Sequence, residues 1–361
     1  MISAGSDILA SDFISTSAGS GDVGRVPKLN ASGFLDVSFM PPINFGDGSD
    51  GALTLDGTNT YGSILSKASA VYTALRDLFV TDIVMSGGAV LVMNGYKLYG
   101  KGTLSGTGTI RNNGTAGGNG DNASGGVNNG GAAGTSAPGV TVPSPASPGA
   151  GGKSDYNTTV AAGGTGGSIT LGYTTTSGSA GGAGGNKSNG GPAGTSSTAI
   201  AWRPKAAGQI NNWFHFSGSS LTAMQVAPGA GGGGGGDLGG GAGTNAGGAG
   251  GGGGGAGGYL FVCFAHIAGT GTITFEAKGA AGGNGGTNTG TGTNHYGGGG
   301  GAGGNGGIIN LNYVTASGYA TDVTGGAAGT GGTASGGVIN ISGSNGAAGS
   351  AGTVITHQLS A

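Results

Sequence analysis

Residues 228–259 read PGAGGGGGGDLGGGAGTNAGGAGGGGGGAGGY, a stretch in which almost no residue has a side chain. Ordering this stretch is costly, because glycine loses more backbone freedom on folding than any other residue. One interpretation is a flexible glycine-rich linker, the usual fate of this composition. The other is a packed array of left-handed extended helices of the polyproline-II type. Such helices have no internal hydrogen bonds, so their N–H and C=O groups must pair between neighbours.

Other glycine runs in the chain favour the ordered form. Residues 281–286 read AGGNGG and residues 300–307 read GGAGGNGG, so Ala or Asn recurs at every third position. In a helix with three residues per turn, these residues fall on one edge and point out of the bundle. A random linker has no reason to keep this phase. Collagen needs strict Gly-X-Y repeats with much proline, and only 10 prolines are present. We therefore predict a polyglycine-II bundle, with residues 228–259 among its most buried helices and Ala249 at an edge.

The overall composition supports a folded chain and excludes some partners. Of 361 residues, 96 are glycine and 35% are hydrophobic, while only 7% are charged. A disordered chain usually has more charge and less apolar content. The net charge of −2 and the lack of a basic stretch argue against a nucleic-acid partner. The longest apolar run, 259–265, is too short to cross a membrane.

The N-terminal residues have neither the basic nor the apolar region of a signal peptide. We therefore expect the protein to be synthesised in the cytoplasm and to leave a cell by lysis or within a particle.

Short apolar segments separated by Gly or Asn turns occupy residues 73–114. Segments of three to five residues at this spacing are typical of the stacked rungs of a β-solenoid. Residues 61–72 have apolar residues at helical spacing, so a helix or a strand is possible there. Asp47 and Asp50 lie in a glycine turn and are weak candidates for calcium ligands, although they lack EF-hand spacing.

From about residue 114 onward, a Gly-Gly pair repeatedly precedes an apolar strand, as in 257–264, 306–313 and 336–341. Internal repetition of this kind indicates a modular array. We expect a hairpin that pairs 259–265 with 271–277.

Alternation within one of these strands predicts a half-buried sheet. Its buried face would carry Ile309, Leu311 and Tyr313, and its other face would carry Asn310 and Asn312.

Side-chain chemistry is concentrated where the glycine pattern is interrupted, above all in 196–227, which holds both tryptophans. Trp and Arg are common interface anchors, and a Trp beside Asn and Arg also suits a sugar. The alternative is that this insertion forms a small core or a subunit contact. The receptor-binding candidates are Trp202, Arg203, Trp213, Phe214, His215, Tyr156, His295 and Tyr296.

Signals for catalysis are absent from the sequence. The four histidines lie far apart, with none at metal-ligand spacing from a Cys or a carboxylate. Glu276 is the only glutamate, so the sparse carboxylates argue against a polysaccharide depolymerase. We expect no enzymatic activity, no cofactor and no structural metal.

Three parts of the chain resemble phage proteins. Residues 1–45 resemble the connector that precedes the shaft in tail-fibre proteins. Residues 46–114 resemble a glycine-rich β-solenoid module of phage structural proteins, through Arg76-Asp77-Leu78, Asn94-Gly-Tyr-Lys97 and Lys101-Gly-Thr-Leu104. Residues 115–361 look like the polyglycine-II sandwich of phage tail-tip adhesins, in which loops between glycine helices face the host receptor. This chain departs from those adhesins in one respect, because they have no solenoid block before the glycine-rich domain.

The sequence therefore predicts an all-β and irregular fold. Its expected architecture is a short β-solenoid followed by a polyglycine-II helix bundle with interspersed short β-strands. The expected domains are a connector at 1–45, a solenoid-like module at 46–114 and a glycine-rich domain at 115–361 with the aromatic insertion 196–227.

The resemblance implies a virion fibre or adhesin, in a virion or outside the cell, that binds a host surface glycan or protein receptor. The alternative is a self-assembling structural subunit of an extracellular filament or capsid layer. Either function implies contacts with other virion or filament subunits. Either also implies that the chain forms a homo-oligomer, as a trimer or a polymer. Neither involves nucleic acid or membrane insertion.

Overall fold

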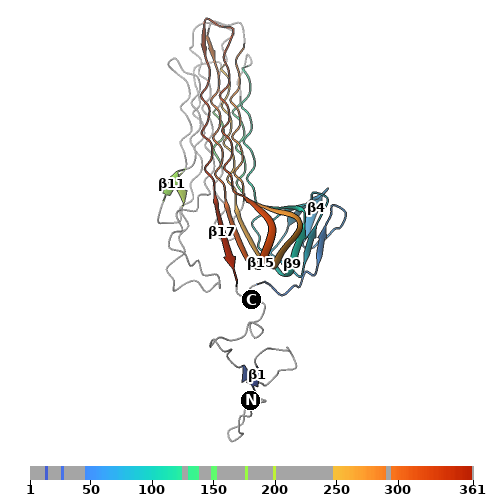
Figure 1. Ribbon diagram of the computed structural model, residues 1–361. Coiled ribbons are helices and arrows are strands. Elements are labelled where there is room, and N and C mark those ends of the chain that lie inside the picture. The colour runs from blue at the N-terminus through green and yellow to red at the C-terminus, as the bar shows by residue number, and fades with distance from the viewer. Residues whose placement is uncertain are drawn as a thin grey trace.

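The computed structural model describes residues 45–123, 129–137, 148–152, 247–289 and 294–359, and the backbone of four short strands outside them. Those four are β1 (Phe13–Ile14), β2 (Val26–Pro27), β11 (Thr175–Ser177) and β12 (Thr198–Ile200). The described residues are all-β, with strands and extended segments and no helix. A module of strands lies at one end, and a long bundle of extended segments rises from it (Figure 1).

The strand module is one open and mostly parallel sheet that follows the short segments predicted from the sequence. Its short strands are β3 (Leu53–Leu55), β4 (Leu65–Ala68), β5 (Val71–Ala74), β6 (Leu78–Val80), β7 (Ile83–Met85), β8 (Val90–Val92), β9 (Leu98–Gly106) and β10 (Gly108–Arg111). Three later strands extend it, namely β13 (Tyr259–Glu276), β15 (Ile308–Asp322) and β17 (Thr353–Gln358). Strand β13 pairs in parallel with β9, β10 and β15, and β15 pairs in parallel with β17.

Residues 61–72 form no helix. Instead β4 and β5 pair as an antiparallel hairpin, with Leu65 opposite Ala74 and Ala68 opposite Val71. The turn between them places Ser69 in the left-handed region, at φ 58°. Leu65, Tyr72 and Ala74 are buried, so the apolar residues here form the buried face of strands and not one face of a helix.

The expected hairpin between 259–265 and 271–277 is wrong. Strand β13 continues from Tyr259 to Glu276 and stays parallel to β15 over this length. The residues interpreted as a turn lie at a register shift between Ala268 and Ile273. Five residue steps along β13 match two along β15 at this point, so β13 accommodates three extra residues as an irregularity within one strand.

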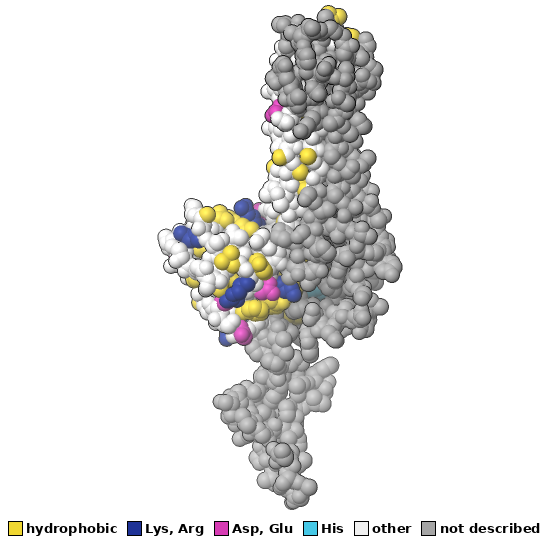
Figure 2. All heavy atoms as spheres, turned by 180° about the vertical axis from the view of Figure 1, so that it is seen from behind, with side chains coloured by type: hydrophobic (Ala, Val, Ile, Leu, Met, Phe, Trp, Pro, Cys, Tyr) yellow, Lys and Arg dark blue, Asp and Glu magenta, His cyan; other side chains and the backbone are white. Residues whose placement is uncertain are grey.

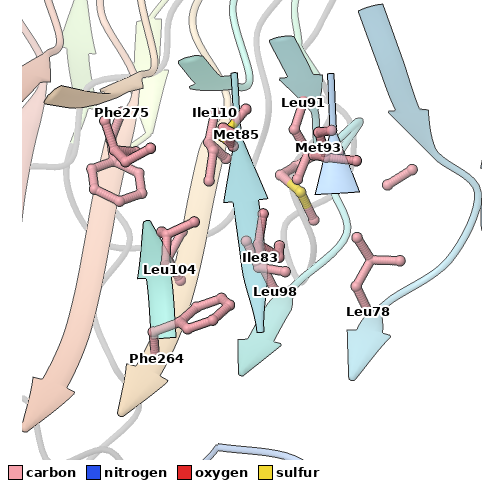
Figure 3. Close-up of a cluster of buried hydrophobic side chains, with 14 of the residues drawn as sticks. Leu78, Ile83, Met85, Leu91, Met93, Leu98, Leu104, Ile110, Phe264 and Phe275 are labelled. Carbon is pink, nitrogen blue, oxygen red and sulfur yellow. The ribbon is translucent and has the colours of Figure 1, made fainter. Parts of the chain in front are cut away.

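The core lies inside the strand module and is built from alternate residues of many strands (Figure 3). Figure 3 shows Phe264 and Phe275 of β13 together with aliphatic side chains of the short strands. In β15, Ile309 and Leu311 join this core as predicted.

The opposite face of β15 is buried as well, which corrects the expectation of a half-buried sheet. Asn310 and Asn312 are 1% and 0% exposed. The Asn310 amide donates to the Tyr259 hydroxyl at 2.9 Å, and Asn312 donates to the Asn310 side-chain oxygen at 3.1 Å. These bonds offset part of the cost of burying two polar side chains, and the Asn312 Oδ1 atom stays without a partner among the described residues.

The glycine-rich bundle consists of extended segments in layers (Figure 1). The outer layer contains 112–123, 277–289 and 323–335, which bond side by side in parallel and run away from the strand module. The inner layer contains 129–137, 247–258, 297–307 and 342–352, which run back toward the module. Bonds between the layers join antiparallel segments, and 148–152 bonds to the inner layer.

Successive N–H groups in 247–258 donate to three different neighbouring segments in turn. Gly251 donates to Gly299 at 2.9 Å, Gly252 to Gly118 at 2.9 Å and Gly253 to Gly149 at 2.8 Å, and Gly254 then returns to the first neighbour at Ala302. The partner segment therefore repeats at every third residue. Residues 247–258 are buried throughout. Residues 228–246 of the same glycine stretch lie outside the described residues.

The non-glycine residues at every third position do not all point outward. Ala281 and Asn284 are exposed, as predicted. Ala302 and Asn305 are 0% and 1% exposed, because their segment lies in the inner layer. Ala249 is also fully buried and does not occupy an edge. The phase of the sequence is therefore informative, but the neighbouring segments decide whether the side chain reaches solvent.

Candidate functional site

The predicted contact residues fall into two groups. Trp202, Arg203, Trp213, Phe214, His215 and Tyr156 lie outside the described residues. His295 and Tyr296 are described and lie in β14 (Asn294–Tyr296), which pairs in parallel with β16 (Ile339–Ile341). These two strands lie at the far end of the bundle, away from the strand module (Figure 1).

At this far end the His295 and Tyr296 side chains are buried, with 0% and 2% exposure. His295 Nδ1 lies 2.5 Å from the Ser335 carbonyl oxygen. A carbonyl oxygen only accepts, so Nδ1 carries the proton and donates to Ser335. This bond ties β14 to the loop before β16. The assignment of both residues to receptor contact stays a prediction.

A loop at 335–338, directly before β16, supplies exposed surface at the far end. Gly336 has φ of 94°, a left-handed conformation that favours glycine. The Asn340 side chain closes the loop on Gly337 with bonds of 3.0 Å to its N–H and 2.7 Å to its carbonyl. The loop presents Val338, whose exposure of 86% is unusual for a large apolar residue. Sequence reasoning assigned Gly336 and Gly337 only to the start of a strand, and so missed this loop.

The asparagines of the outer layer serve the backbone. Asn119 Oδ1 accepts the Asn284 N–H at 2.9 Å, and Asn284 Oδ1 accepts the Thr330 N–H at 2.9 Å. Asn122 Oδ1 accepts the Thr287 N–H in the same way, at 2.9 Å. These N–H groups face outward, where no described segment supplies a carbonyl, so the side-chain amide replaces that partner. The sequence shows where the asparagines occur but not this role.

Asp47 and Asp50, the calcium candidates, have partners within the protein. Asp50 forms an ion pair with Arg76 and accepts the Phe79 N–H at 2.8 Å. Asp47 accepts the Ser49 N–H at 2.9 Å, and this bond lowers the pKa of the Asp47 carboxyl. Among the described residues, no group of three or more His, Cys, Asp or Glu side chains could hold a metal ion. The aspartates therefore fasten a turn to the strand module.

Charged groups meet where the bundle joins the strand module. Lys278 Nζ lies 3.2 Å from Asp322 Oδ2 and 3.8 Å from Glu276 Oε1. These carboxylates raise the pKa of Lys278. For Asp322, burial acts to raise the pKa, but hydrogen bonds from Thr324 and the Lys278 charge outweigh it and the pKa is lowered. This group stabilises the junction electrostatically.

Cys263 is buried, and burial raises the pKa of its thiol to about 12. The thiol is therefore protonated at neutral pH and is not a reactive nucleophile.

No protein-family model, curated protein or solved structure matches this chain. Within the described ranges, the structure contains no helix of the length and apolar character needed to span a bilayer.

Proposed function

We propose that this protein is a non-enzymatic virion fibre or adhesin that binds a receptor or polysaccharide on a host cell surface. Its described part would be a short β-solenoid that carries a polyglycine-II bundle. The protein would act in a virion or outside the cell.

The three-residue alternation of hydrogen-bond partners supports the polyglycine-II assignment. A helix with three residues per turn directs successive N–H groups about 120° apart. Each group then meets a different neighbour, as in 247–258. Apart from the antiparallel β4–β5 hairpin, the short strands from β3 to β10 pair in parallel, which supports the solenoid assignment because a solenoid stacks parallel rungs.

One observation carries the adhesin function. Strands β14 and β16 lie together at the end of the elongated bundle that is farthest from the strand module (Figure 1). Val338 gives this end an exposed apolar side chain that a partner could cover. Loops on a rigid scaffold are a common location for binding residues.

Cell binding tests this function. Purified protein should bind the cells of one strain in a panel of bacterial strains. The variant with Trp202→Ala and Trp213→Ala should lose this binding while keeping the thermal stability of the wild type. Undiminished binding by the double variant would remove 196–227 as the contact. If no strain binds the wild type, the adhesin proposal fails.

The alternative is a structural subunit that assembles into a filament or capsid layer. The flat and nearly uncharged outer layer favours it, because side-by-side packing needs little desolvation of charge. Electron microscopy of the purified protein separates the two. Discrete particles support the adhesin, and long polymers support the structural subunit. Release of sugar from host envelope by either preparation would contradict a non-enzymatic protein.

A further inference from the structure

The outer layer of the bundle has one face that no described segment covers. Its exposed residues form rows across the three segments, since the hydrogen-bonded pairs keep constant sequence offsets. Asn119 pairs with Asn284 at an offset of 165, and Asn284 pairs with Thr330 at an offset of 46. One turn closer to the strand module, the same offsets align Ala116, Ala281 and Ala327, which are all exposed.

This face carries hydrogen-bond donors. The Oδ1 atoms of Asn119, Asn122 and Asn284 accept backbone N–H groups, which fixes the orientation of each amide. Each Nδ2 group is therefore turned away from that bond, on an exposed side chain. The face thus presents amide donors at three-residue intervals.

The same face carries acceptors at the same interval. In 277–289, the carbonyls of Ala281 and Asn284 accept from the neighbouring outer segment, and those of Ala280 and Gly283 accept from the inner layer. The third set has no donor among the described residues and is left for the outward side. It comprises the carbonyls of Gly279, Gly282 and Gly285.

Charge is nearly absent from this face. Between Lys278 near the strand module and Asp121 near the far end, its three segments contain no charged residue. In Figure 2 the Lys and Arg side chains gather on the strand module, while the described surface of the bundle is white and yellow with an acidic side chain near its far end. No side chain between those two charges is larger than Asn, so a partner can approach the backbone closely.

We propose that this face binds the same face of a second copy of the chain. Donors and acceptors with one period make the face self-complementary, as a two-fold interface requires. Only a partner with the same three-residue backbone is certain to match that period. Its area is roughly 500 Å² per copy, from about 3.1 Å per residue and about 4.8 Å between segments. The total of about 1,000 Å² lies at the low end for specific interfaces, so the dimer is weak.

Sedimentation velocity over a dilution series tests the interface. Wild-type protein should move from monomer to dimer as its concentration rises. Ala281→Glu places a charge from each copy in this nearly uncharged interface and should weaken dimerisation at least about tenfold. Ala52→Glu, on an exposed alanine of the strand module, is the matched control and should leave dimerisation unchanged. A wild type that stays monomeric would overturn the proposal, as would an Ala281→Glu variant that dimerises normally. A face used for a polysaccharide would give the monomeric result.

Cross-linking gives a second measurement. With a thiol-reactive cross-linker that spans the two copies, Ala281→Cys should form a covalent dimer, whereas Ala52→Cys should not, and the buried Cys263 contributes to neither. Equal cross-linking of both variants would contradict the assigned face. This inference names a second copy of the chain as a partner of the proposed fibre. It does not require that the fibre bind a receptor. A protein that dimerises but binds no cells would contradict only the adhesin function. A protein that binds cells but stays monomeric would contradict only the dimer interface.

Discussion

Gly301 lies directly against the carbonyl group of Gly252, so close that a Cβ atom on Gly301 would come within 3.0 Å of the Gly252 oxygen. Real Cβ atoms essentially never approach so closely, and here the obstacle is backbone, which cannot rotate away. The two residues belong to neighbouring segments of the inner layer. The bundle therefore depends on glycine for space between backbones as well as for its conformation.

Gly301→Ala should destabilise the protein by about 1–3 kcal/mol, the usual cost of overpacking a close-packed interior. Chemical denaturation measures the change. Gly62→Ala is the matched control, because nothing lies within 4 Å of a Cβ at that position and its backbone is not left-handed. The control should be neutral or slightly stabilising. Equal stability of the two variants would contradict the packing of 297–307 against 247–258.

Gly100→Ala should destabilise the strand module by about 1–3 kcal/mol for a related reason. A Cβ on Gly100 would collide with the ring of Phe264, which is fully buried. Here the obstacle is a side chain, so a smaller one should relieve the collision. Adding Phe264→Leu to Gly100→Ala should therefore cost less than the two single substitutions summed, as a double-mutant cycle by denaturation would show. Strict additivity would count against the contact.

Asn284→Ala should lower stability by about 0.5–1.5 kcal/mol, because it removes the side-chain acceptor of the Thr330 N–H. Thr333→Ala is the control, since Thr333 is exposed in the same layer and makes no side-chain hydrogen bond in the described structure. Thermal unfolding of both variants gives the comparison. An equal loss in the two would mean that the asparagine does not serve the backbone.

Acid should lower the stability of the junction between the bundle and the strand module, because it protonates Asp322. Its pKa is lowered from 3.8 in the folded state, so its contribution is present above pH 3.8 and is lost as pH falls through the lower folded value. Asp322→Asn should reduce the difference in unfolding free energy between neutral pH and acid. An unchanged acid dependence in this variant would assign the effect to other carboxylates, such as Asp47.

The strands of the module were largely predictable, because turns and apolar triplets are local signals. Segments 78–80, 83–85 and 90–92 follow the sequence pattern closely. Strand β13 was harder, since Gly269 and Gly271 predict a turn but the parallel neighbour β15 keeps the chain extended. Burial of both faces of β15 likewise depends on distant segments that the alternation of one strand does not reveal.

For the glycine segments, sequence predicted the three-residue phase but not the layer. Ala281 and Ala302 occupy the same position in the repeat, yet one is exposed and the other is buried. The difference arises from which segments lie beside each, and this is tertiary information. The loop at Val338 was missed because two glycines before an apolar run predict a strand equally well.

Hydrogen exchange of the glycine segments tests the central claim most directly, because a linker and a packed bundle differ in the fate of every backbone N–H. If residues 247–258 are packed as described, their amides should exchange as slowly as those of β13. Peptides covering 247–258 and 297–307 would be followed by mass spectrometry beside a peptide from β13. Complete exchange of the glycine peptides at the earliest time, with β13 still protected, would contradict an ordered bundle.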